Sequence, residues 1–282
     1  MTLVVAVIAP GAMGAAVGKR LADHGVKVLT SLAGRSASSV ARAGEAGMIG
    51  ASDEAIAAAD FILSILPPGD ALPLADRFAP VLQASNAKPV YVDCNAINPA
   101  TLERVAAAIA PSGCAFVDAG IIGAPPKGND AGPRFYASGE AALRFAVLRE
   151  SGLDVRVLDG PLSAASALKM SYAGITKGMQ AIGAAMMLAA TRAGSAEALT
   201  KELASSQKEM LALFKQQLPM MPAKAYRWIA EMREIAGFVA ADPAAHDLYE
   251  GAAHFYERIA EDFAADKKDV AALMDFLGKS SP

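Results

Sequence analysis

The sequence predicts two structural parts, a doubly wound α/β domain over residues 1–160 and an all-helical domain over residues 161–282. In the first part, short apolar segments alternate with helical patterns, which is typical of a parallel sheet covered by helices. After Gly160 and Pro161, strand patterns stop and only helical patterns continue. A chain of 282 residues is long enough for two domains with a substantial core.

The first predicted element is a strand, turn and helix of the kind that binds phosphate groups. Residues 4–8 read Val-Val-Ala-Val-Ile, and residues 15–21 follow a helical pattern. Between them, Gly11 leaves room for the backbone to approach a pyrophosphate, and Gly14 lets the helix lie close to the strand. The helix N-terminus offers N–H donors and a positive dipole end. We therefore expect a Rossmann-type nucleotide-binding domain. The expected cofactor contacts in the turn are Ala9, Gly11, Ala12, Met13 and Gly14.

Ala9 is a departure from the usual pattern, because it stands where such turns have their first glycine. Alanine does not readily adopt positive φ. The position must therefore keep a φ that alanine tolerates, or the turn must be slightly remodelled.

The end of the second predicted strand, residues 26–30, favours NADP over NAD. A carboxylate in this region usually accepts hydrogen bonds from the ribose hydroxyls of NAD. No Asp or Glu occurs from Val26 to Ser39, and Arg35 offers instead a planar fork of donors that suits a phosphate. The expected cofactor contacts here are Ser31, Arg35 and Ser36.

The remaining strands of the first part are expected at residues 61–66, 89–93, 115–117, 134–137 and 155–158. Open α/β sheets bind their ligands at the carboxyl ends of strands. We therefore expect Leu66 and Pro67 to contact the cofactor, and Asn95 to lie beside both cofactor and substrate. Helices are predicted at residues 163–192, 196–217, 226–241 and 244–276.

Lys169 lies on the longest predicted helix, among small and apolar residues that favour an uncharged amine. An amine in such surroundings suits general acid–base catalysis. The polar and small residues spaced to share its helix face are Tyr172, Ala173, Thr176 and Gln180.

Three blocks in the expected order make the chain resemble the β-hydroxyacid dehydrogenase superfamily, which includes 3-hydroxyisobutyrate and 6-phosphogluconate dehydrogenases. They are the turn at residues 9–14, Asp-Ala-Gly-Ile-Ile-Gly at residues 118–123, and the segment 160–169. Residues 93–99 are similar to the family's loop between cofactor and substrate. The last helices resemble a poorly characterised branch of the superfamily that has its own helical C-terminal domain. There the resemblance implies fold and cofactor, but no substrate.

By this resemblance, Lys169 takes the place of the family's catalytic lysine. It implies hydride transfer between a nicotinamide and a small hydroxy acid or carbonyl compound, with Lys169 as general acid and base. The implied substrate contacts are Asn95, Ile122, Gly123, Tyr172 and Thr176.

The sequence departs from the family at several positions around this implied site. Ala173 replaces an asparagine and Ile122 replaces a serine, which weakens the grip on a carboxylate substrate. Thr176 stands where the decarboxylating branch has an acidic residue, so we do not expect decarboxylation. Two alternatives therefore stay open. One is an imine reductase or reductive aminase, although such relatives usually replace the lysine. The other is a non-catalytic NADP-binding regulator.

Composition excludes several other classes. The net charge of −3 offers no basic field for nucleic acid or an anionic membrane surface. The apolar run at residues 181–190 is too short to span a bilayer. Cys94 and Cys114 have no metal-ligand spacing and suit a reducing compartment, and no charged leader precedes the first strand, so we expect a cytoplasmic protein. No metal site is expected, because His246, Glu250 and His254 fit a solvated helix face.

The long predicted helix also bears on assembly. It contains Gly174, Gly178 and Gly183, which allow close helix packing. Together with the family resemblance, this predicts a homodimer.

Overall fold

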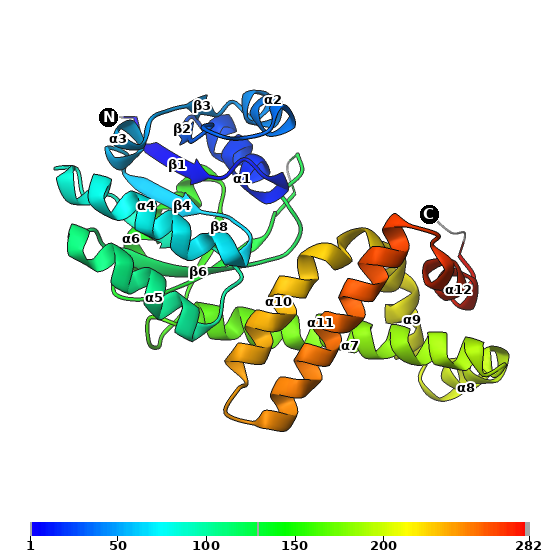
Figure 1. Ribbon diagram of the computed structural model, residues 1–282. Helices are drawn as coiled ribbons and strands as arrows, with labels where there is room; N and C mark the ends of the chain where they lie inside the picture. Colours follow the sequence, from blue (N-terminus) through cyan, green and yellow to red (C-terminus); the bar gives the residue numbers. More distant parts are fainter. Residues whose placement is uncertain (1, 129, 280–282) are drawn as a thin grey trace. The chain divides into compact units, whose positions relative to one another are not determined.

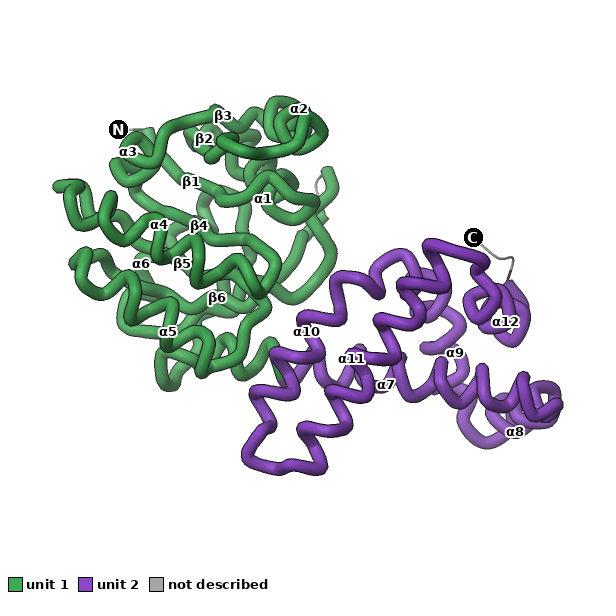
Figure 2. The backbone as a smooth tube through the Cα atoms, viewed as in Figure 1, with its two compact units in different colours: residues 1–170 green, residues 171–282 purple. Residues whose placement is uncertain are grey.

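The computed structural model describes residues 2–128 and 130–279. The chain divides into two compact units, residues 1–170 and residues 171–282 (Figure 2). This division lies inside the long helix α7 (Ala164–Arg192), whereas the sequence placed a domain boundary at residue 160, ahead of that helix.

Within the described residues of unit 1, eight strands form one sheet in the order β3-β2-β1-β4-β5-β6-β7-β8 (Figure 1). All neighbouring pairs are parallel except β6 and β7, which are antiparallel. The doubly wound fold class is therefore confirmed. The strands are β1 (Val4–Ile8), β2 (Lys27–Thr30), β3 (Ile49–Gly50), β4 (Phe61–Ser64), β5 (Val90–Asp93), β6 (Phe116–Ile122), β7 (Arg134–Ser138) and β8 (Asp154–Val157).

Two details of the sheet differ from the sequence prediction. The two-residue strand β3 was not predicted, because it is too short to produce an alternating pattern. The predicted end of the sixth strand at Val117 is wrong, since β6 continues to Ile122. Gly120, within this extension, has low strand propensity, but the strand is held by pairing with β7 from Asp118 to Ile122.

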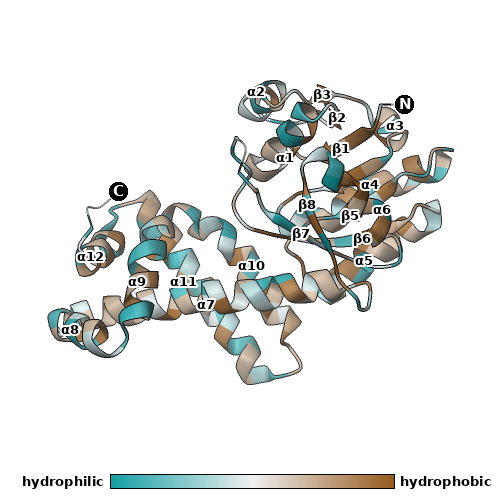
Figure 3. Cartoon of the chain, turned by 180° about the vertical axis from the view of Figure 1, so that it is seen from behind, coloured by the Kyte–Doolittle hydropathy of each residue, from teal (hydrophilic) through white to brown (hydrophobic). Residues whose placement is uncertain are grey.

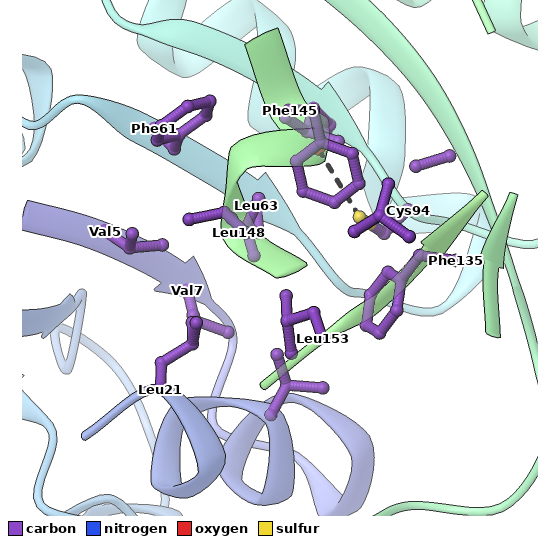
Figure 4. Close-up of a cluster of buried hydrophobic side chains, with 14 of the residues drawn as sticks. Val5, Val7, Leu21, Phe61, Leu63, Cys94, Phe135, Phe145, Leu148 and Leu153 are labelled. Atoms are coloured by element: carbon purple, nitrogen blue, oxygen red, sulfur yellow. Dashed lines mark hydrogen bonds between the residues drawn. The ribbon is translucent and has the colours of Figure 1, made fainter. Parts of the chain in front are cut away.

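The sheet is buried on both faces, which explains the continuous apolar strands. Because side chains alternate along a strand, Val5 and Val7 lie in one hydrophobic cluster, while Ala6 and Ile8 lie in the other. Figure 4 shows the first cluster, in which strand residues meet Leu21 of α1 and Phe145 of α6. Helices α3, α4 and α5 contribute to the second. The helices of unit 1 before α7 are α1 (Ala12–Asp23), α2 (Ala37–Glu45), α3 (Asp53–Ala57), α4 (Ala71–Ala84), α5 (Pro99–Ile109) and α6 (Ala142–Phe145).

The described part of unit 2 is helical, as predicted. Two predicted helices are each broken in two. Gln207 leaves helical geometry between α8 and α9, and Lys267 has a left-handed φ of 57° between α11 and α12. The edge-to-face contact of Trp228 with Tyr256, at 5.3 Å between centroids, joins α10 to α11. The helices after α7 are α8 (Ala196–Ser206), α9 (Lys208–Gln217), α10 (Ala225–Phe238), α11 (Pro243–Ala264) and α12 (Lys268–Phe276). None of the helices among the described residues has the length and apolarity needed to cross a membrane.

Candidate functional site

The glycine turn between β1 and α1 has the features that the sequence predicts. A Cβ atom on Gly14 would overlap the carbonyl oxygen of Ala9, so only glycine fits there. A Cβ on Gly11 would meet nothing within 4 Å, and both Gly11 and Ala12 are exposed at the start of α1. Ala9 is not among the described residues with positive φ, as its side chain requires. The N–H of Gly11 donates to the carbonyl oxygen of Ala9 at 2.8 Å, so the N–H donors that α1 offers begin at Ala12. These donors fit the pyrophosphate of a dinucleotide.

Residues from α2 and α4 support the turn and the end of β2. Arg42 of α2 donates a hydrogen bond to the carbonyl oxygen of Pro10 at 3.0 Å. The hydroxyl of Ser36 caps α2 by accepting from the backbone N–H of Ser39. The side chain of Arg35 is exposed at the same end of β2. Ser31, which follows β2 directly, is 2% exposed, and its hydroxyl accepts a hydrogen bond from Arg77 at 2.8 Å.

Arg77 and its ion-pair partner Asp53 were missed by sequence reasoning. Asp53 begins α3 and Arg77 lies within α4, so neither belongs to a local motif around β2. The structure brings both to the end of β2.

Asn95 joins the carboxyl ends of β4 and β5. Its amide oxygen accepts from the N–H of Leu66 at 2.6 Å, and its amide nitrogen donates to Ser64 and Asp93 at 2.8 and 2.9 Å. The side chain is 3% exposed, so its hydrogen-bonding capacity is used within the protein. The structure thus places Leu66, Asn95 and, one residue further, the exposed Pro67 together, as expected for one loop cluster. Burial raises the pKa of the Asp93 carboxyl to about 6, against the opposing effect of the Asn95 hydrogen bonds.

Lys169 lies against the carboxyl end of β6. Its amine donates a hydrogen bond to the carbonyl oxygen of Ile121 at 2.6 Å and is partly buried. A Cβ on Gly120 would come within 2.8 Å of the carbonyl oxygen of Ala165, so this glycine permits the close approach of α7. Ile122 is buried at the end of the strand, and Gly123 follows with φ of 133°. The structure therefore brings Lys169 to the backbone beside the predicted substrate residues 122 and 123.

Two strand residues cap the first turn of α7. Asp118 accepts hydrogen bonds from the backbone N–H and the hydroxyl of Ser166, at 2.6 and 2.8 Å. Its neighbour across the strand pair, Ser138, accepts from the backbone N–H of Ala165 at 2.9 Å. These bonds satisfy N–H groups that have no partner within a helix. Burial raises the pKa of Asp118 to about 7, although both hydrogen bonds from Ser166 act to lower it.

Tyr172 and Thr176, the other predicted substrate residues, belong to unit 2. Tyr172 is half exposed, and the hydroxyl of Thr176 donates to the carbonyl oxygen of Tyr172 within the same helix. Their role stays a prediction. Among residues 2–128 and 130–279, no group of three or more His, Cys, Asp or Glu side chains is arranged to hold a metal ion.

The strands β1, β4, β5 and β6 are parallel neighbours, so the glycine turn, the Asn95 cluster and the carbonyl that binds Lys169 lie along one edge of the sheet. This arrangement is an NAD(P)-binding, dehydrogenase-like scaffold. The chain belongs to the family described as the NAD binding domain of 6-phosphogluconate dehydrogenase, whose model matches residues 4–149. Residues 190–259 match a second family, a domain of unknown function named DUF1932.

Solved structures with the same fold cover almost the whole chain. The conserved protein MTH1747, of unknown function and described as similar to 3-hydroxyacid dehydrogenases, is 29% identical, with a TM-score of 0.68 over 91% of this chain and 99% of that one. The 3-hydroxyisobutyrate dehydrogenase of Mycobacterium tuberculosis, solved with L-serine, is 21% identical, with a TM-score of 0.73 over 98% and 99%. An imine reductase of Streptomyces aurantiacus is 17% identical, with a TM-score of 0.57 over 98% and 99%. No curated protein matches the chain.

Proposed function

We propose that the protein is an NADP-dependent oxidoreductase that interconverts a small hydroxy acid and the corresponding carbonyl compound. The observation that carries the proposal is the position of the Lys169 amine. It lies at the carboxyl end of β6, on the sheet edge that also bears the glycine turn. A proton-transferring group is therefore held on the dinucleotide-binding edge of one compact unit.

Lys169 would move the proton of the reacting hydroxyl group. When bound, the dinucleotide supplies or accepts the hydride. In the direction of oxidation, the neutral amine of Lys169 takes the hydroxyl proton; in reduction, the ammonium form donates a proton to the carbonyl oxygen. The hydrogen bond to Ile121 holds the amine at one place on the strand in both forms, because either form has an N–H to donate. Ala12 and Met13, the first two residues of α1, would receive the pyrophosphate on their backbone N–H groups.

The catalytic role is tested by Lys169→Ala and a matched control, Lys88→Ala. Lys88 also donates to backbone carbonyl groups, those of Leu82 and Gln83, but it follows α4 near the start of β5. Turnover would be screened against a panel of hydroxy acids and carbonyl compounds. We expect Lys169→Ala to lose turnover by a factor of about 100 or more, as for a general acid–base group, with NADPH affinity unchanged. Equal turnover in the wild type and Lys169→Ala would refute the role.

The preference for NADP is supported by the exposed Arg35 and by the lack of an acidic residue from Val26 to Ser39. Fluorescence titrations with NADPH and NADH test it directly. We expect tighter binding of NADPH. Preference for NADH would refute the cofactor assignment while leaving the oxidoreductase class intact.

An imine reductase or reductive aminase is the second candidate, and the shared fold with an imine reductase over 98% of the chain favours it. Reduction of a ketone in the presence of an amine, measured as NADPH oxidation, would distinguish this activity. A third possibility is a non-catalytic NADP-binding regulator. The buried, aliphatic Ile122 favours it, because this side chain offers no hydroxyl to a substrate. Turnover on neither panel, with NADPH still bound, would favour that role.

We also propose that the protein forms a homodimer through α7. Five large apolar side chains on this helix are exposed and recur at alternating spacings of three and four residues, as in a helix–helix seam. They are Tyr172, Ile175, Met179, Ile182 and Met186. Figure 3 shows brown, apolar segments along α7. Sedimentation of the wild type as a dimer, and of Ile182→Glu as a monomer, is the expected result; a monomeric wild type would refute the proposal.

The cytoplasm remains the proposed compartment. Cys94 and Cys114 are both buried and free, which suits a reducing environment. Cell fractionation would test this assignment.

A further inference from the structure

One accessible polar group at the end of β2 is the guanidinium of Arg77, which comes from a distant part of the chain. Ser31, the first residue after β2, is 2% exposed, so a ligand cannot reach its hydroxyl. Arg77, whose side chain is 39% exposed, donates to that hydroxyl at 2.8 Å. The sequence predicts that Ser31 contacts the cofactor. In the structure, the group that a ligand can reach at this position is Arg77.

Asp53 holds this guanidinium in a fixed plane. Its two carboxylate oxygens accept from Nε and Nη2 of Arg77, at 2.8 and 2.5 Å. Such a two-point contact orients the group, so little further ordering is needed when it binds another anion. In the described part of the chain, no residue accepts a hydrogen bond from Nη1 of Arg77. That nitrogen is thus available to a ligand.

We infer that Arg77 is a specificity-determining residue that receives the 2′-phosphate of NADP together with Arg35. This inference rests on the proposed NADP-dependent function. The carboxyl end of β2 is where domains of this fold recognise the adenosine ribose, and a planar arginine matches a phosphate with two donors. Arg35 is exposed on the loop after β2, whereas the guanidinium of Arg77 is already oriented by hydrogen bonds to Asp53 and Ser31 before a ligand binds. The two cations reach the same end of β2 from different segments.

The ion pair also explains why a carboxylate near β2 does not favour NAD. Asp53 is brought to the region where NAD-binding domains use an acidic residue on the ribose hydroxyls. Here both of its oxygens accept hydrogen bonds from Arg77. The carboxylate is therefore neutralised by its partner, and the cation remains the exposed member of the pair.

The test compares 2′,5′-ADP with AMP, and NADPH with NADH, as ligands of the full chain. These pairs differ by the 2′-phosphate alone. For Arg77→Ala we expect 2′,5′-ADP and NADPH to bind about 10- to 100-fold more weakly, the range for a lost charged hydrogen bond. AMP and NADH should change by less than about threefold.

Two controls separate the cation from the ion pair. Asp53→Asn removes the same ion pair but keeps Arg77, and we expect NADPH to lose much less affinity than in Arg77→Ala, because the cation that meets the phosphate remains. Arg104→Ala removes an exposed arginine of α5 and should change nothing. If Arg77→Ala does not fold, Arg77→Lys keeps the charge without the planar fork, and the expected loss is specific to NADPH and 2′,5′-ADP.

Four outcomes would overturn the inference. If Arg77→Ala weakens the binding of NADPH and of NADH by the same factor, Arg77 contributes only to the stability of the domain. Asp53→Asn that loses as much NADPH affinity as Arg77→Ala would assign the effect to the ion pair. If the wild type prefers NADPH and Arg77→Ala keeps the same preference for NADPH over NADH, Arg77 does not recognise the 2′-phosphate. The proposed function would then still hold. A wild type that binds neither cofactor, or prefers NADH, would overturn the proposed cofactor use and this inference together.

Discussion

Gly120→Ala is the substitution that most directly tests how β6 and α7 are joined. The added Cβ would lie 2.8 Å from the carbonyl oxygen of Ala165 and 3.2 Å from Cβ of Lys169. The nearest neighbour is helix backbone, which cannot rotate away as a flexible side chain can. The start of α7 must therefore move from the strand, and the hydrogen bonds of Asp118 with Ser166 would lengthen with it.

Overpacking of this kind destabilises by about 1–3 kcal/mol. For a unit of this size, each kcal/mol lowers the melting temperature by roughly 2–4 °C. We expect Gly120→Ala to melt several degrees below the wild type and to lose turnover, because Lys169 moves with the helix. Gly44→Ala in α2 is the matched control. A Cβ there meets nothing within 4 Å, so helix propensity should raise stability by up to about 1 kcal/mol.

Differential scanning fluorimetry measures the melting temperatures, and the screen of hydroxy acids and carbonyl compounds measures turnover. If Gly120→Ala melts at the wild-type temperature and keeps full turnover, the close approach of β6 and α7 does not position Lys169, and the reasoning fails.

Two further predictions concern buried polar groups. Burial raises the pKa of Asp118 to about 7, so the folded state binds a proton that the unfolded state releases near pH 4. The free energy of unfolding should therefore fall as pH rises from about 4 to 7, and urea titrations of Asp118→Asn should show a smaller decrease; an unchanged slope would contradict the assignment. Asn95→Ala removes the side-chain partners of the Leu66 N–H and of Oδ2 of Asp93, while the backbone N–H of residue 95 still donates to Oδ1 of Asp93; a loss of about 2–4 kcal/mol is expected in urea unfolding. Thr101→Ala, in α5, is its control, and an equal loss in both variants would contradict a special role for the Asn95 side chain.

The fold was predictable from local pattern because its signals are local. A buried β-branched strand, a turn with two glycines and an apolar helix face occur within the first 21 residues, and the structure confirms β1, the turn and α1 in that order. The same holds for the long helix, predicted at residues 163–192 and observed as Ala164–Arg192. Breaks in regular structure were less predictable. Lys267 interrupts a helix through a left-handed φ that its residue type does not signal.

The candidate site was only partly predictable. Lys169 and the glycine turn could be recognised from the residues that flank them in the sequence. Both lie on the edge of the sheet where the strands have their carboxyl ends. The surroundings of Ser31 and Asn95 were different from expectation. Each is buried, and its side chain bonds with protein groups, because strands and helices distant in sequence converge there.

The sequence by itself determined the order of strands and helices, the glycine turn and the position of the lysine on its helix, because periodicity and residue type act over a few residues. Only the tertiary structure decided which side chains meet. Asp118 and Ser138 cap α7, and Arg77 joins Asp53 at the end of β2, through pairings of distant segments. Such contacts depend on strand register and helix packing, which no single segment encodes.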